Sequence, residues 1–421
     1  MVELRSRHAW FVVATALAAC SFSDPPPVDP DAGSADAGGD VAIPCPGAGV
    51  SKGPWVIGVH GTAATIRFEA CRAGVLGDIV LEPEAGGAPQ TVPTKETATV
   101  VTQTFVAPFN PDAPPDYAGT WYMHEAALTG LAEATCYRYT LAADATAKGR
   151  FCTARKSGDT FRVLAIGDTN PGLGDTTSKL LEHLVPENFD FTIHLGDIEY
   201  YASTLETWAL WAPKMAPMLR QGAFFPSIGN HESEKPTEYS EYVLRYFGST
   251  GLPGSDGTYR FSSGGVHFFV LDTEEPIGPA STQAAWFAQE IVKAEQEPGY
   301  RFSIVYYHRP IVSCGDVSDS PESRQYYEPL FIQHKVKMVL QGHMHGYERF
   351  DFGNIVYVTS GGGGGRIVDP SQHMERPYCN KRVAAGPIFH GTILEVKPGA
   401  LDGKIIDETG AVRDSYSIPA P

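Results

Sequence analysis

Five short apolar segments after residue 160 each end directly before a group of Asp, Asn, Tyr or His residues. The segments span residues 161–166, 191–195, 223–228, 302–307 and 336–340, and each has the length of a buried strand. The polar residues that follow them include, in chain order, Asp168, Asp197 and Tyr200, Asn230 and His231, His308, and His343 and His345. Because the carboxyl ends of parallel strands meet at one edge of a sheet, we expect these side chains to lie close together.

Helical patterns alternate with these strands. They cover residues 177–184, 205–219, 237–246, 282–295 and 321–334. Further apolar strands are expected at 266–271 and 355–359, and the chain returns to β patterns at 391–396, 403–407 and 415–418. This alternation predicts an α/β domain over residues 157–421, with layered β-sheets flanked by helices.

The preceding segment, residues 51–156, has a different pattern. Short alternating strands separated by turns fill it, and no amphipathic helix interrupts them. Roughly seven short strands in about 100 residues are typical of a sandwich. We therefore expect an N-terminal all-β sandwich, fibronectin type III-like, ahead of the α/β domain.

The N-terminus has the pattern of an export signal over residues 1–20. Arg5 and Arg7 precede an apolar core, which ends in Leu17-Ala18-Ala19-Cys20. This ending resembles the bacterial lipoprotein box and implies a lipidated Cys20, with Ser21 favouring the outer membrane. An ordinary cleaved signal peptide, leading to a periplasmic or secreted protein, is the alternative. Residues 21–50 are rich in Pro, Asp, Gly and Ala and predict a disordered tether.

Six cysteines remain if Cys20 carries lipid, and an exported protein lies where disulfides persist. Six cysteines allow 15 pairings. Proximity in the sequence favours Cys45–Cys71, Cys136–Cys152 and Cys314–Cys379. A zinc cluster is the alternative, but the sequence has no CxxC pair to support it.

The charge balance excludes one class of partner. The chain has 32 Lys and Arg against 49 Asp and Glu, a formal net charge of −17. A nucleic-acid-binding face needs clustered basic residues, and none is found. Beyond the N-terminus no apolar run approaches the ~20 residues of a membrane-spanning helix.

The polar groups after the strands have the chemistry of a two-metal centre. Carboxylates, an amide and several imidazoles are suitable ligands for divalent or trivalent ions. A glycine stands before most of them, as in Gly167-Asp168 and Gly229-Asn230, and allows the backbone to turn sharply beside an ion.

The ordered set resembles the calcineurin-like metallophosphoesterase superfamily, and in detail the purple acid phosphatases. Tyr200 stands three residues after Asp197, and residues 342–349 read GHMHGYER, as in that branch. The segments Lys52-Gly53-Pro54-Trp55, Val266–Glu274 and Tyr327–Phe331 are similar too. The first motif departs from the family pattern, because Asp168 is followed by Thr169-Asn170 instead of a residue and a glycine.

The resemblance implies the ligands of a binuclear metal centre. The first ion, Fe(III), is expected on Asp168, Tyr200 and His345. The second ion, a divalent Fe, Zn or Mn, is expected on Asn230, His308 and His343. The carboxylate of Asp197 would bridge the two.

The activity implied is hydrolysis of phosphomonoesters by a hydroxide generated between the two metals, with an acidic to near-neutral pH optimum. His231 is the expected general acid for the leaving group, or else a residue that only orients its neighbours. The plant-like histidines near the substrate are absent, which leaves Arg309 or Arg366 as candidates to bind the phosphate.

Other functions stay open at this point. A phosphodiesterase or nucleotide pyrophosphatase could use the same scaffold, and a catalytically inactive surface binding module is a remote alternative. Tyr200 could also pack beside two divalent ions without binding either.

Overall fold

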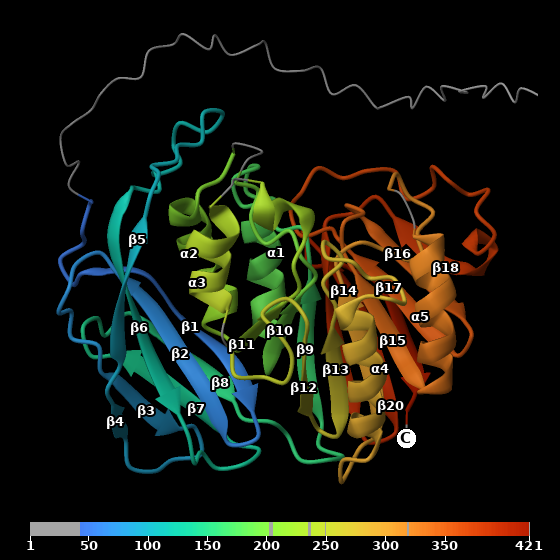
Figure 1. Ribbon diagram of the computed structural model, residues 1–421, viewed down its shortest axis with the longest axis horizontal. Coiled ribbons are helices and arrows are strands. Elements are labelled where there is room, and N and C mark those ends of the chain that lie inside the picture. The colour runs from blue at the N-terminus through green and yellow to red at the C-terminus, as the bar shows by residue number, and fades with distance from the viewer. Residues whose placement is uncertain (1–42, 202–204, 235–236, 249, 318–319, 421) are drawn as a thin grey trace, which may run out of the picture. The chain divides into compact units, whose positions relative to one another are not determined.

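The computed structural model describes residues 43–201, 205–234, 237–248, 250–317 and 320–420 (Figure 1). The predicted export signal, lipidated Cys20 and tether residues up to 42 lie outside the described residues. Residues from Ile43 onward form one compact unit. In the described part of the chain, no helix combines the length and the apolar character needed to cross a bilayer.

A ten-stranded sheet extends through this unit. In spatial order its strands are β21 (Val412–Pro419), β20 (Ala400–Asp407), β19 (His390–Lys397), β9 (Phe161–Ile166), β10 (Phe191–His194), β11 (Ala223–Pro226), β1 (Val50–His60), β2 (Ala63–Ala70), β6 (Gly119–Leu128) and β5 (Lys95–Val101). Strands β9, β10 and β11 are parallel, as the sequence predicts for the strands before the first three polar groups.

The N-terminal β-sandwich is confirmed, and it shares this sheet. Strands β1, β2, β6 and β5 face a four-stranded sheet of β4 (Gln90–Val92), β3 (Ile79–Pro83), β7 (Cys136–Leu141) and β8 (Lys148–Cys152). Phe68 of β2, Leu81 of β3 and Phe151 of β8 pack in the core between them. Strand β1 also pairs in parallel with β11 through Val56 and Ala223, so hydrogen bonding crosses the expected boundary at residues 156 and 157.

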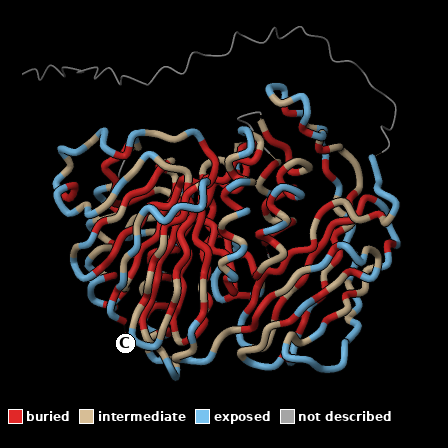
Figure 2. The backbone as a smooth tube through the Cα atoms, turned by 180° about the vertical axis from the view of Figure 1, so that it is seen from behind, coloured by how far each residue is buried: buried red, intermediate tan, exposed pale blue. Residues whose placement is uncertain are grey.

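A seven-stranded sheet forms the second layer of the α/β domain. Its order is β12 (Tyr259–Ser263), β13 (Val266–Val270), β14 (Phe302–Tyr307), β15 (Val336–Gln341), β17 (Ile355–Ser360), β16 (Tyr347–Phe352) and β18 (Arg382–Gly386). The two large sheets pack face to face, and Phe191 of β10 makes edge-on ring contacts with Phe225, Phe261 and Phe268. Figure 2 shows the buried strands of this core.

Helices cover the outer faces of both sheets. The helices are α1 (Thr176–Leu184), α2 (Trp208–Leu219), α3 (Leu244–Phe247), α4 (Thr282–Glu295) and α5 (Pro321–Gln333), with short turns η1 (Val185–Glu187), η2 (Asn230–Ser233), η3 (Tyr239–Val243) and η4 (Cys379–Lys381). Helices α1 to α3 pack on the ten-stranded sheet, and α4 and α5 pack on the seven-stranded sheet. The predicted layered α/β architecture is therefore confirmed.

All three expected disulfides are present. They join Cys45 to Cys71, Cys136 to Cys152 and Cys314 to Cys379. The first of them links residues 43–49, which the sequence assigned to the tether, to the end of β2. Disulfides persist in oxidising compartments, so the three bonds indicate an extracytoplasmic protein.

A buried ion cluster joins the sandwich to the helical layer. Glu69 of β2 lies 2.7 Å from the Nζ of Lys52 and 2.9 Å from an Nη of Arg245, which belongs to α3. The exposed fraction of the Glu69 side chain is 0%, and that of each cation is 5%. Burial raises the pKa of Glu69, but Arg245 and Lys52 outweigh this effect and leave the pKa below its ordinary value.

We expect Glu69→Ala to lower the free energy of unfolding by about 3–5 kcal/mol, because two buried cations lose their anion. Urea unfolding followed by fluorescence measures this. Glu125→Ala is the control: Glu125 pairs with Arg67, but its side chain is 38% exposed, and we expect a loss below about 1 kcal/mol.

The Glu69 contribution should also depend on pH. With its pKa lowered in the folded state, its stabilisation is complete above about pH 4.5 and is lost as the pH falls through the lowered pKa. Equal losses in the two variants at pH 7 would contradict this account.

Candidate metal centre

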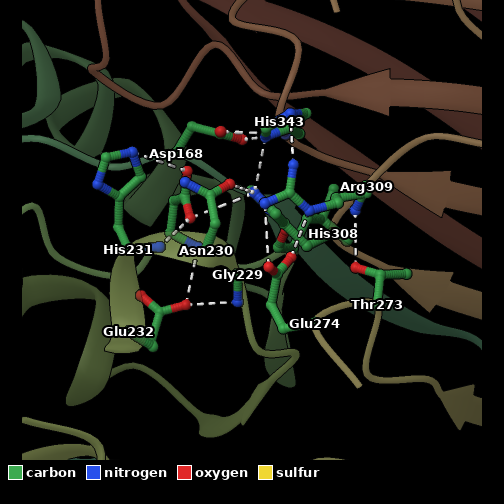
Figure 3. A network of polar contacts seen from close by, with 12 residues as sticks. Asp168, Gly229, Asn230, His231, Glu232, Thr273, Glu274, His308, Arg309 and His343 are labelled. Atoms are coloured by element: carbon green, nitrogen blue, oxygen red, sulfur yellow. Dashed lines mark hydrogen bonds and ion pairs between the residues drawn. The ribbon is translucent and has the colours of Figure 1, made fainter. Parts of the chain in front are cut away.

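The structure brings all seven expected ligands to one place, where the two large sheets meet. Three loops of the ten-stranded sheet supply part of the set, and two loops of the seven-stranded sheet supply the rest (Figure 3). After β9, β10 and β11 come Asp168, Asp197 with Tyr200, and Asn230; after β14 and β15 come His308, and His343 with His345.

Asp197 lies at the centre of the cluster. Its carboxylate belongs to two groups of side chains whose ligand atoms lie within 4.8 Å of one another: one with His308 and His343, the other with Asp168 and His345. Its Oδ1 is 3.2 Å from the Nε2 of His308. The hydroxyl of Tyr200 is 3.5 Å from its Oδ2. One carboxylate therefore faces both groups.

Two of the imidazoles are oriented by backbone carbonyls. The Nδ1 of His308 lies 2.8 Å from the oxygen of Leu195, and the Nδ1 of His345 lies 2.9 Å from the oxygen of Arg366. Each Nδ1–H can donate to its carbonyl, which leaves the Nε2 lone pair directed at the carboxylates. Ligand histidines in metal sites are usually held in this way.

Further close contacts connect the ligand-type side chains with one another. The Nε2 of His308 is 3.1 Å from the Oδ1 of Asn230 and 3.1 Å from the Nδ1 of His343. The hydroxyl of Tyr200 is 2.9 Å from the Nε2 of His345. Several lone-pair atoms thus converge, and this donor set of oxygen and imidazole nitrogen fits divalent or trivalent metal ions.

The local backbone is shaped for these contacts. Asp168, Asp197 and His343 adopt positive φ values of 59°, 49° and 66°, which are uncommon for residues other than glycine. Such conformations often mark functional sites. Gly229 allows close packing beside them, because a Cβ there would lie 2.3 Å from the backbone nitrogen of Asp197.

The electrostatics also require positive charge. Burial raises the pKa of Asp168 above its usual value. For Asp197, burial acts in the same direction, but His308 outweighs it and holds the pKa below the usual range. Burial lowers the pKa of His308, but Asp197 outweighs this and raises it to about 10. Metal cations held between these side chains would also compensate the negative charge of the buried carboxylates.

His231 lies beside the cluster on η2. Its Nδ1 is 2.6 Å from the Oε1 of Glu234, and its Nε2 is 3.8 Å from the Oδ2 of Asp197. Its ring centroid lies 4.3 Å from that of Tyr200. Burial lowers the pKa of His231, but the hydrogen bond to Glu234 and the charge of Asp197 raise it overall.

Glu232 has a role that the sequence did not reveal. Its side chain is fully buried and accepts hydrogen bonds from the backbone N–H groups of Asp197 (3.1 Å), Ile198 (2.6 Å) and Gly229 (2.6 Å). It therefore fixes the loop after β10 to the loop after β11. The polar pattern of residues 230–232 was the only signal in the sequence, and it did not separate Glu232 from a ligand.

Comparison with known proteins shows what this part of the chain is similar to. Residues 161–347 match the family model of the calcineurin-like phosphoesterases. The chain is 28% identical over 263 residues to a phosphoenolpyruvate phosphatase of Allium cepa, covering 57% of this chain and 53% of the relative. It is 26% identical over 212 residues to the probable purple acid phosphatase 20 of Arabidopsis thaliana, covering 46% and 49%. The chain thus spans about half the length of these curated relatives.

A solved structure shares the fold over most of the chain. The purple acid phosphatase PPD1 from yellow lupin (Lupinus luteus) seeds superposes with a TM-score of 0.67 at 17% identity. The match covers 87% of this chain and 74% of that one. The fold that the two chains share is a β-sandwich followed by an α/β domain.

Proposed function

We propose that this protein is a metal-dependent phosphatase that hydrolyses phosphomonoesters, similar to the purple acid phosphatases. The observation that carries the proposal is the position of Asp197, whose single carboxylate faces two separate groups of ligand-type side chains. The phosphatase names of the curated relatives support a phosphomonoester as the substrate class.

The residues that would hold the ions follow from the two groups. Asp168, Tyr200 and His345 would hold the first ion, and Asn230, His308 and His343 the second, with Asp197 shared. Bound there, two ions would supply Lewis acidity toward a phosphate oxygen and would lower the pKa of a coordinated water.

The first position suits Fe(III). Its donors include the phenol of Tyr200 and two carboxylates, whereas the second position has more nitrogen and a neutral amide. Burial and the charge of Asp197 raise the pKa of Tyr200 well above its usual value, so its ionisation needs a strong Lewis acid. A divalent ion, Fe, Zn or Mn, suits the second position.

His231 is proposed as the general acid. The Glu234 carboxylate lies 2.6 Å from its Nδ1 and so favours a protonated ring whose Nε2 faces the cluster. A proton on that Nε2 is available to a leaving-group oxygen that lies between His231 and the proposed ions.

The protein's location follows in part from its disulfides. An extracytoplasmic protein encounters phosphate esters outside the cytoplasm. Anchoring to the outer membrane through a lipidated Cys20 remains our proposal, supported by the sequence pattern of residues 17–20.

The function is tested by comparing p-nitrophenyl phosphate with bis(p-nitrophenyl) phosphate as substrates of the metal-loaded protein. We expect a higher kcat/KM for the monoester, and we expect Asp197→Asn to lower it by at least about 10²-fold, because both ions lose a charged ligand. Asp175→Asn, at an exposed carboxylate paired with Lys179, is the control and should be neutral. Faster hydrolysis of the bis-ester would instead support a phosphodiesterase.

We expect His231→Ala to keep both ions but to slow hydrolysis of alkyl phosphates by roughly 10²–10⁴-fold. Aryl phosphates with activated leaving groups should lose much less, because those groups leave without a proton. The ratio of the two rates is measured in steady-state assays. A similar loss for both substrates would mean that His231 only orients its neighbours.

We expect the iron-loaded protein to show a tyrosinate-to-iron charge-transfer band in its visible spectrum. Tyr200→Phe should abolish the band, since it removes the phenol oxygen. Tyr201→Phe is the matched control, because Tyr201 is also buried but belongs to the core under α2 and η3. A colourless wild-type protein with stoichiometric iron would overturn this assignment.

A further inference from the structure

Arg309 lies at the edge of the candidate metal centre and is held there by the loop after β13. Its backbone N–H donates to the Oγ1 of Thr273 at 2.9 Å. Its Nε and Nη2 donate to the two carboxylate oxygens of Glu274 at 2.7 and 3.0 Å. A bidentate pair of this kind fixes the plane of the guanidinium as well as its position. Figure 3 shows Glu274 and Thr273 on one side of Arg309 and His343 on the other.

The guanidinium still has unused donors. An arginine has five side-chain N–H groups. Two donate to Glu274, and the Nη1 lies 3.2 Å from the Nε2 of His343. One N–H on each Nη therefore has no partner among the described residues. The Arg309 side chain is 38% exposed, so a molecule entering from solvent can reach these groups.

We propose that Arg309 binds an oxygen of the substrate's phosphoryl group, with Glu274 as the residue that positions it. This inference rests on the proposed phosphatase function and names the residue that recognises its substrate. Arginine suits the task because it stays charged and offers planar, paired donors to phosphate oxygens. Its position beside His343 places this charge next to the second proposed ion.

The contact with His343 adds a further donor. The Nδ1 of His343 faces the cluster, 3.1 Å from the Nε2 of His308. If that Nδ1 presents its lone pair to a cation, the ring proton resides on Nε2, and Arg309 can no longer donate there. The N–H that faces His343 is then available to a phosphate oxygen as well.

Arg366, the other candidate from the sequence, is used differently. Its backbone oxygen accepts from the Nδ1 of His345, and its side chain is exposed. Its backbone therefore orients a ligand, and no residue holds its guanidinium toward the cluster among the described contacts.

The test measures binding of inorganic phosphate to the metal-loaded full chain by calorimetry, and its inhibition constant in the monoester assay. We expect Arg309→Gln to weaken phosphate binding and raise KM by about 10- to 100-fold, the range for hydrogen bonds to a charged group. Arg309→Lys should recover part of this loss, because it restores the charge without the paired donors. Glu274→Gln should give an intermediate loss.

Arg162→Gln is the matched control. Arg162 also pairs with a glutamate, Glu395, at 2.9 Å and is 42% exposed, but it lies at the opposite end of β9 from Asp168. The phosphate affinity of the Arg162→Gln variant should equal that of the wild type. Metal content measured on every variant should stay at the wild-type value.

Three results would overturn the inference: unchanged phosphate affinity in Arg309→Gln, an equal loss in Arg162→Gln, or a loss that follows a reduced metal content. The phosphatase proposal fails separately. If the wild type hydrolyses no monoester but binds phosphate, and Arg309→Gln loses that binding, the phosphate-binding role stands and the proposed reaction is wrong.

Discussion

The buried carboxylate of Asp197 needs positive charge around it, and the surrounding structure is arranged to meet that need. A carboxylate taken out of water is costly unless opposite charges and hydrogen bonds compensate it. The Nε2 of His308, from the seven-stranded sheet, lies 3.2 Å from the Asp197 carboxylate. The backbone N–H of His231, from the ten-stranded sheet, donates to the same carboxylate at 3.1 Å. The two sheets must therefore keep their relative position for the site to exist, and their shared aromatic core maintains it.

The sequence predicted the parts of the fold that have strong local signals. Fully buried strands such as β10 and β14 are continuous apolar runs, and a polar group at a strand end is visible beside them. Strands β12, β16 and β18 were missed, because they lie at or next to the edges of their sheet. Their alternating or charged residues, as in Tyr347–Phe352 (YERFDF), resemble loop sequence. The pairing of β1 with β11 joins residues far apart in the chain and leaves no local pattern.

In the site, too, the sequence predicted the features that have a local signal and missed those that depend on residues far apart in the chain. The ligand-type residues were found because each follows a strand, whereas the residues that hold them were not. Glu232 directly follows the predicted ligand Asn230 and the predicted acid His231, yet it binds three backbone N–H groups. Glu274 and Arg309 are 35 residues apart and meet only because β13 and β14 are parallel neighbours. Contacts of this kind depend on the sheet order, which no single segment of the sequence encodes.

The central claim is that Asp197 is shared by two metal ions. Anomalous diffraction from crystals of the metal-loaded protein, with data collected on both sides of the iron absorption edge, tests it directly. The account predicts two ions that share Asp197 as a ligand, with iron at the position beside Tyr200 and His345. A single ion, or two ions that do not share Asp197, would contradict it.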